Sequence, residues 1–151
     1  MLLKTHLSIT LFGILLLVSN VEHKIVFVLV AILATYIPDI DSRYSTIGKR
    51  KINRVLQFFT KHRGFIHSFV FLIMLTGLIV LIFPIISLGF FLGYSLHLFA
   101  DSFTKDGIQP FYPFSKKRVK GRIATGGKAE ISLLVVFVII DLFLLAGLIF
   151  F

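Results

Sequence analysis

The amino-acid sequence predicts an all-α integral membrane protein with about five transmembrane helices and one interfacial amphipathic helix. Of its 151 residues, 57% are hydrophobic and only 15% are charged, and the mean hydropathy is +0.97. These values are typical of membrane proteins rather than soluble domains. The apolar residues also fall into five runs, which polar turns and basic loops separate. The length suits one domain, so we expect residues 1–151 to form a single membrane-embedded unit.

The first two expected spans cover residues 2–19 and 22–38. The apolar run 7–18 has the character of a secretory signal, but residues 18–20 make a poor cleavage site, so we expect an uncleaved helix. Pro38 ends the second span, because proline cannot continue the hydrogen-bond ladder of a helix.

A basic stretch, residues 42–63, follows the second span. Within it, apolar residues recur at helical spacing among several Lys and Arg residues: Ile52, Val55, Leu56 and Phe59. This pattern predicts an amphipathic helix that lies on an anionic membrane surface.

The third and fourth expected spans, residues 65–83 and 85–103, are separated by Pro84 and should form an antiparallel hairpin. A second basic loop, residues 105–128, follows and contains several turn signals. Residues 131–151 form the fifth expected span.

The distribution of Lys and Arg residues predicts the topology. With five spans, 15 of the 16 Lys and Arg residues lie on one side, and only Lys24 lies opposite. The positive-inside rule then places the N-terminus and both basic loops in the cytoplasm and the C-terminus outside, in a cytoplasmic (inner) membrane. The net charge of +9 is thereby explained by topology and by contact with anionic membrane lipids, and a nucleic-acid partner is not expected.

His97 and Asp101 lie four residues apart near the end of an apolar span, so they share one helix face. Ionisable groups at membrane depth are costly and mark function by default. Counting spans places seven His and Asp residues at the same cytoplasmic end, carried by four segments: His6, Asp39, Asp41, His62, His67, His97 and Asp101. His23 lies on the opposite side and has the character of an ordinary loop residue.

These seven residues indicate a metal site. Any one of them alone has a simpler explanation, such as a helix cap or a hydrogen-bonded histidine, but seven together would be costly to desolvate without an ion. Imidazole and carboxylate in a chain without cysteine favour Zn, with Mn or Fe as alternatives. Seven candidates exceed one tetrahedral shell, so either two ions bind or some residues orient the ligands of a single ion.

The segments that carry these residues resemble the YdjM-like inner-membrane metal-dependent hydrolases. The resemblance covers the chain to about residue 113 and rests on residues 5–6, 38–41, 62–68 and 97–104, with Gly107 and Pro110. It implies a multi-span membrane protein with hydrolase activity and with the seven His and Asp residues as metal ligands. The order of the ligands is also similar to that in zinc-dependent phospholipase C enzymes, an analogy only.

We therefore expect a membrane-bound metal-dependent hydrolase that acts on a lipid or lipid-linked phosphoester at the cytoplasmic interface. Asp39 or Asp41 would accept the proton of the attacking water. Lys61 and Arg63 would bind the phosphate, and Arg63 would stabilise the developing charge. Two alternatives stay open: a non-catalytic metal-binding membrane protein and a metal-ion transporter.

Three further residues are weaker candidates. Thr104 would donate a hydrogen bond near the site or cap a helix, and Glu130 would be a ligand or general base. Asp141 falls too deep in the last span for the site, so we expect an inter-helix hydrogen bond or a subunit contact there. A homo-oligomer is compatible with the second of these roles.

Overall fold

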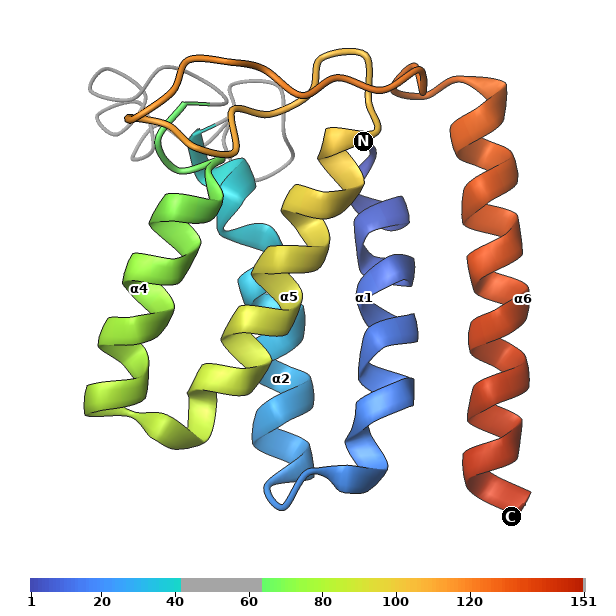
Figure 1. The fold of residues 1–151 in the computed structure, drawn as a ribbon. Coiled ribbons are helices and arrows are strands. Elements are labelled where there is room, and N and C mark those ends of the chain that lie inside the picture. The colour runs from blue at the N-terminus through green and yellow to red at the C-terminus, as the bar shows by residue number, and fades with distance from the viewer. Residues whose placement is uncertain (42–63, 151) are drawn as a thin grey trace.

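The computed structural model describes residues 1–41 and 64–150, and in this part of the chain five α-helices stand side by side (Figure 1). They are α1 (Leu3–Leu17), α2 (Lys24–Tyr36), α4 (Phe69–Ile82), α5 (Pro84–Ser102) and α6 (Lys128–Phe150). Short 3-10 turns follow the first two: η1 (Val18–Asn20) and η2 (Pro38–Asp41). The described residues contain two isolated bridges and no β-strand, so the prediction of an all-helical fold is confirmed.

Helix α5 lies at the centre of the bundle and contacts α1, α2 and α4, whereas α6 packs against α1 (Figure 1). The N-terminus lies at the same end of the bundle as the connection between α5 and α6, and the C-terminus lies at the opposite end. The turns at α1–α2 and α4–α5 are at that opposite end. The expected interfacial helix in residues 42–63 lies outside the described residues.

Two glycines allow α5 to approach α2 closely. A Cβ atom on Gly93 would lie 2.0 Å from the carbonyl oxygen of Ala31, and one on Gly89 would lie 2.7 Å from that of Phe27. Small residues four apart let two helix backbones pack in direct contact, a common device in membrane helices. The same i, i+4 row of α5 continues to the end of the helix, where it carries the candidate metal ligands.

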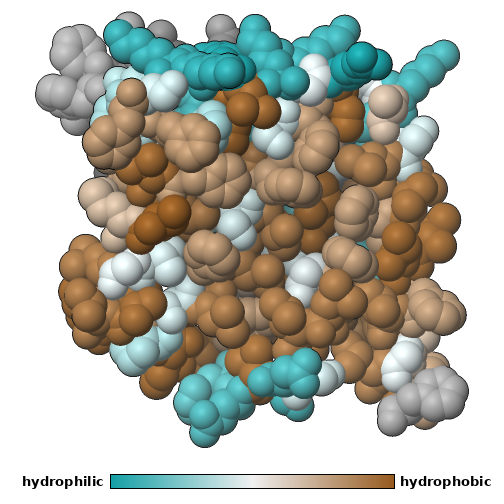
Figure 2. All heavy atoms as spheres, viewed as in Figure 1, coloured by the Kyte–Doolittle hydropathy of each residue, from teal (hydrophilic) through white to brown (hydrophobic). Residues whose placement is uncertain are grey.

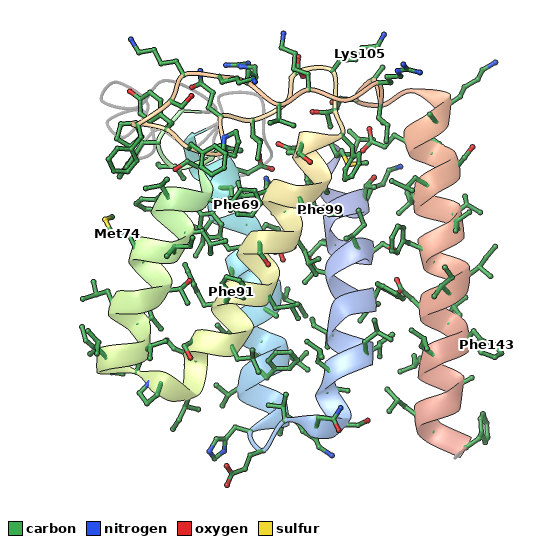
Figure 3. The ribbon with its side chains drawn as sticks, in the orientation of Figure 1. Phe69, Met74, Phe91, Phe99, Lys105 and Phe143 are labelled. Carbon is green, nitrogen blue, oxygen red and sulfur yellow. The ribbon has the colours of Figure 1, made fainter. Side chains whose placement is uncertain are left out.

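The face of the bundle that Figure 2 shows is apolar across its middle and polar at the end that carries the N-terminus, with a smaller polar patch at the opposite end. Helix α6 is exposed along most of its length, and Phe143 points away from the other helices with 79% of its surface exposed (Figure 3). Such an apolar surface suits lipid rather than water.

Three described helical segments are long and apolar enough to cross a membrane: Leu3–Asn20, Pro84–Ser102 and Lys128–Phe150. Helices α2 and α4 are apolar but have only 13 and 14 residues, short of the roughly 20 residues that span a hydrocarbon core. The expected count of about five transmembrane helices is therefore not confirmed, because two helices fall short in length.

Helices α4 and α6 begin three or four residues away from where they were expected, and the other three begin within two residues. Helix α4 begins at Phe69, four residues later, because the Ser68 hydroxyl accepts a hydrogen bond from the backbone N–H of Phe71 at 3.1 Å and caps the helix there. Helix α6 begins at Lys128, three residues earlier, after a turn in which Gly126 has a φ of 74°. Glu130 therefore lies in the first turn of α6.

The connection between α5 and α6, residues 103–127, forms an ordered cap over one end of the bundle, and we call it the cap loop (Figure 1). Ile108 and Val119 exchange backbone hydrogen bonds of 3.0 and 2.9 Å. Ile108 is fully buried against the helices. The carbonyl oxygen of Pro110 accepts a 2.9 Å bond from the N–H of Phe69, so the cap loop also fixes the start of α4.

Candidate metal centre

Five His and Asp side chains meet beneath the cap loop. They are carried by four segments: His6 by α1, Asp39 by η2, His67 by the segment before α4, and His97 and Asp101 by the last turns of α5. The three histidines and Asp101 expose at most 2% of their side chains, while Asp39 exposes 18%. The cluster is therefore a buried polar group at the end of an apolar bundle, and Asp39 is its most exposed member.

The Asp101 carboxylate is the centre of the cluster. Its Oδ1 atom lies 3.4 Å from Nε2 of His6, and its Oδ2 atom lies 3.9 Å from Nε2 of both His67 and His97. Asp39 reaches the same group from another direction, with Oδ1 4.0 Å from Nε2 of His97. These distances of 3.4–4.0 Å equal or slightly exceed the spacing of about 3.4 Å between two atoms bound to one tetrahedral ion at about 2.1 Å.

The three imidazole rings are packed against one another. The rings of His6 and His97 are stacked, with centroids 3.9 Å apart and planes 6° from parallel. The ring of His67 meets that of His97 edge-on, with centroids 5.7 Å apart. Three histidines and two carboxylates in direct contact form a donor set of the kind that binds zinc and other divalent transition metals.

The backbone of α2 fixes the orientation of His97. Its Nδ1 atom lies 2.8 Å from the carbonyl oxygen of Thr35. A carbonyl oxygen can only accept a hydrogen bond, so Nδ1 carries the proton and Nε2 has its lone pair available. This Nε2 atom is buried and has no hydrogen-bond partner among the described residues, which fits a ring whose outer nitrogen is held and whose inner nitrogen binds an ion.

Thr35 itself is held by two neighbours. Its hydroxyl donates to the carbonyl oxygen of Ala31 one turn earlier, at 2.9 Å, and lies 2.9 Å from the hydroxyl of Thr10 on α1. Both threonine side chains are fully buried. Helices α1, α2 and α5 are therefore joined by hydrogen bonds directly below the cluster.

The segment that carries His67 is held in place by Tyr94 on α5. The buried Tyr94 hydroxyl donates to the carbonyl oxygen of Ile66 at 2.6 Å. The next residue, Ser68, caps α4. His67 is thus fixed from both sides, which places its ring in the cluster without a helix of its own.

Positively charged or chargeable groups lie close to both carboxylates of the cluster. The α-amino group of Met1 lies 2.6 Å from Oδ1 of Asp101, so this oxygen already attracts a cation. Burial raises the pKa of Asp39 above its ordinary value, although His6 and His67 act in the opposite direction. A divalent ion at the centre would favour the charged form of both carboxylates.

The structure places the sequence-predicted residues as follows. Five of the seven expected metal ligands are brought together: His6, Asp39, His67, His97 and Asp101. Asp41 lies in η2, but its side chain is outside the described part of the structure, as are Lys61, His62 and Arg63. His23 is exposed at the far end of the bundle, as expected for a loop residue.

Glu130 belongs to a different hydrogen-bond network. Its carboxylate accepts bonds from the N–H of Leu2, the hydroxyl of Thr5 and the N–H of Gly126, at 2.5, 2.9 and 2.6 Å. It therefore attaches α6 to the start of α1, next to His6. Glu130 is therefore not one of the five clustered side chains that could hold a metal ion.

The other two weaker candidates also have defined partners. The Thr104 hydroxyl donates to the carbonyl oxygen of Asp101 at 2.7 Å and accepts from the N–H of Gly107 at 3.2 Å, so it closes the end of α5. Asp141 accepts a 2.9 Å hydrogen bond from the Ser8 hydroxyl, an inter-helix bond between α1 and α6.

Sequence reasoning missed Thr35, Thr10 and Tyr94. Thr35 acts through a backbone carbonyl, which every residue has, so no side-chain pattern could have revealed it. The spacing of Gly89 and Gly93 was a readable signal, because glycines four apart in an apolar helix predict a close helix contact.

The comparison with known protein families agrees with this architecture. Residues 1–150 match the model of the family described as YdjM inner membrane protein. No match was found among curated proteins or among solved structures. Because the match covers nearly the whole chain and the helices are apolar, the chain is a membrane protein that belongs to the YdjM inner membrane protein family.

Proposed function

We propose that this protein is a membrane-bound metal-dependent hydrolase that acts on a lipid or lipid-linked phosphoester at the cytoplasmic membrane interface. The observation that carries the proposal is the convergence of five His and Asp side chains from four segments at one end of the bundle. Burying imidazoles and carboxylates so close together costs free energy unless they bind a common ion or ions. A bound divalent ion, for which Zn is the first choice, would activate water and polarise the ester.

The five clustered side chains would have two different roles, metal binding and proton transfer. His6, His67, His97 and Asp101 are nearly fully buried and would hold the metal, as one or two ions. Asp39 is the most exposed of the five and lies 4.0 Å from His97, so it is the carboxylate best placed to meet water and take up its proton. Asp41, Arg63 and Lys61 keep their proposed roles in proton transfer and phosphate binding.

The location of the cluster supports an amphiphilic substrate. The cluster lies between an apolar bundle and a cap loop that carries six Lys and Arg residues, among them Lys105 (Figure 3). We place this end of the bundle at the cytoplasmic face. In this proposal all five helices cross the membrane, and α2 and α4 are the two shortest. A lipid would then present its headgroup at the depth of the cluster, and the surrounding cations would attract a phosphate.

The test is a turnover assay with the full-length protein in detergent or liposomes. Lipid phosphoesters would be offered to the Zn-loaded protein, to the chelator-treated protein and to Asp39→Asn, with Asp106→Asn on the exposed cap loop as matched control. We expect metal-dependent cleavage that falls by about 10²–10⁴-fold in Asp39→Asn at unchanged metal content and persists in Asp106→Asn. Metal binding without turnover of any phosphoester or ester would contradict the hydrolase and favour a binding or transport protein.

A further inference from the structure

The stacked rings of His6 and His97 limit how these two residues can share an ion. Their planes are 6° from parallel, and the ring centroids are 3.9 Å apart. The lone pair of an imidazole nitrogen lies in the plane of its ring, whichever nitrogen is used. Lone pairs in two parallel planes do not converge on one point.

Distances make the limit quantitative. Stacked rings in contact have planes about 3.5 Å apart, so an ion midway between them would lie about 1.7 Å outside each plane. A metal–nitrogen bond is about 2.0–2.1 Å long, so most of that bond would run perpendicular to the ring instead of along the lone pair. Two ions, one in the plane of each ring, would instead be separated by at least the plane spacing of about 3.5 Å.

The Asp101 carboxylate has the matching arrangement. Its Oδ1 atom faces His6 at 3.4 Å, and its Oδ2 atom faces His97 at 3.9 Å. A carboxylate whose two oxygens face two different histidines can bridge two ions. Metal pairs in two-ion hydrolytic sites are about 3.5–4 Å apart, which agrees with the spacing of the two rings.

We propose that this cluster binds two divalent cations bridged by the carboxylate of Asp101. The inference rests on the proposed metal site and extends it. One cation lies near Nε2 of His97, where His67 and Oδ2 of Asp101 complete a set of three protein ligands and Asp39 lies beside it. The other lies in the plane of His6 and is held by that ring and by Oδ1 of Asp101, where it replaces the α-amino group of Met1, which lies 2.6 Å from that oxygen.

The two positions differ in the number of ligands that the described residues supply. The position at His97 has three, whereas the position at His6 has two, so the cation at His6 binds more weakly and keeps more coordination sites for water or substrate. A pair of ions at this spacing can hold both the attacking and the leaving oxygen of an in-line displacement. The two-ion arrangement therefore suits the phosphoester substrate of the proposed function.

The experiment is a titration of the purified full-length protein with Mn²⁺ alone, followed by electron paramagnetic resonance and by metal analysis. We expect about two ions per chain, bound with unequal affinity, and a spectrum of exchange-coupled Mn²⁺, as a carboxylate-bridged pair would give. In His6→Ala we expect about one ion per chain and an uncoupled spectrum, while His23→Ala, a histidine at the opposite end, keeps the wild-type values.

Each other outcome overturns part of the account. One uncoupled ion per chain in the wild type would refute the pair while leaving the proposed metal site intact. No bound ion would refute the site as well. Loss of both ions in a folded His6→Ala protein would refute the unequal assignment of ligands, and the wild-type spectrum decides between one ion and a pair even if that variant does not fold.

Discussion

The carbonyl oxygen of Thr35 on α2 accepts a hydrogen bond from Nδ1 of His97 on α5 over 2.8 Å. This bond determines which nitrogen of His97 faces the cluster, and it exists only because the two helix backbones lie unusually close. Gly93, one turn before His97, has no side chain to hold them apart. The packing of the bundle and the chemistry of the site are thereby coupled through one pair of helices.

The first prediction concerns this close contact. Gly93→Ala places a Cβ where the structure leaves 2.0 Å to the carbonyl oxygen of Ala31, so the helices must separate. We expect a loss of about 1–3 kcal/mol of stability and weaker metal binding, since Thr35 moves away from His97. Thermal unfolding in detergent and metal affinity measure the two effects.

Gly77 on α4 is the matched control, because a Cβ there meets nothing within 4 Å. Gly77→Ala should leave metal binding unchanged and stability equal or higher by about 0.5–1 kcal/mol, because alanine favours helix more than glycine does. Equal behaviour of the two alanine variants would show that the α2–α5 contact does not position the site.

The second prediction concerns the attachment of α6. Ser8→Ala removes the only hydrogen bond that Asp141 makes among the described residues and leaves a carboxyl in an apolar groove of about 230 Å³. We expect a cost of about 0.6 kcal/mol and no more than about 1.7 kcal/mol, the average and the maximum measured for side-chain hydrogen bonds between membrane helices. In an Asp141→Leu background the same Ser8→Ala change should cost nothing, since no carboxyl is left unpaired. An equal cost in both backgrounds would show that the bond does not hold α6 to α1.

The third prediction concerns orientation. The chain has no cysteine, so single cysteines can be introduced at Lys117 in the cap loop and at Glu22 in the turn between α1 and α2, both exposed. An impermeant thiol reagent should label Glu22→Cys in intact cells and Lys117→Cys only after the cells are opened. Labelling of Lys117→Cys in intact cells would show that the proposed orientation in the membrane is wrong.

The sequence predicted those features that depend on spacing and on counting spans. His97 and Asp101 share a face because they are four residues apart, and His6, Asp39 and His67 reach the same end because the chain reverses direction at each turn. The count of membrane-spanning helices is not confirmed, because a helix of 13 residues such as α2 lies within a longer apolar run of the sequence. The role of Glu130 could not be inferred, because its partners are two backbone N–H groups and one hydroxyl.

The central claim is that the buried His and Asp cluster binds metal, and metal content tests it most directly. The full-length protein, loaded with Zn²⁺ and freed of excess, should retain the ion, and His97→Ala and Asp101→Asn should lose most of it while still inserting into the membrane. His23→Ala is the control, since His23 is exposed at the far end of the bundle. Equal zinc content in the wild type, His97→Ala, Asp101→Asn and His23→Ala would contradict the account.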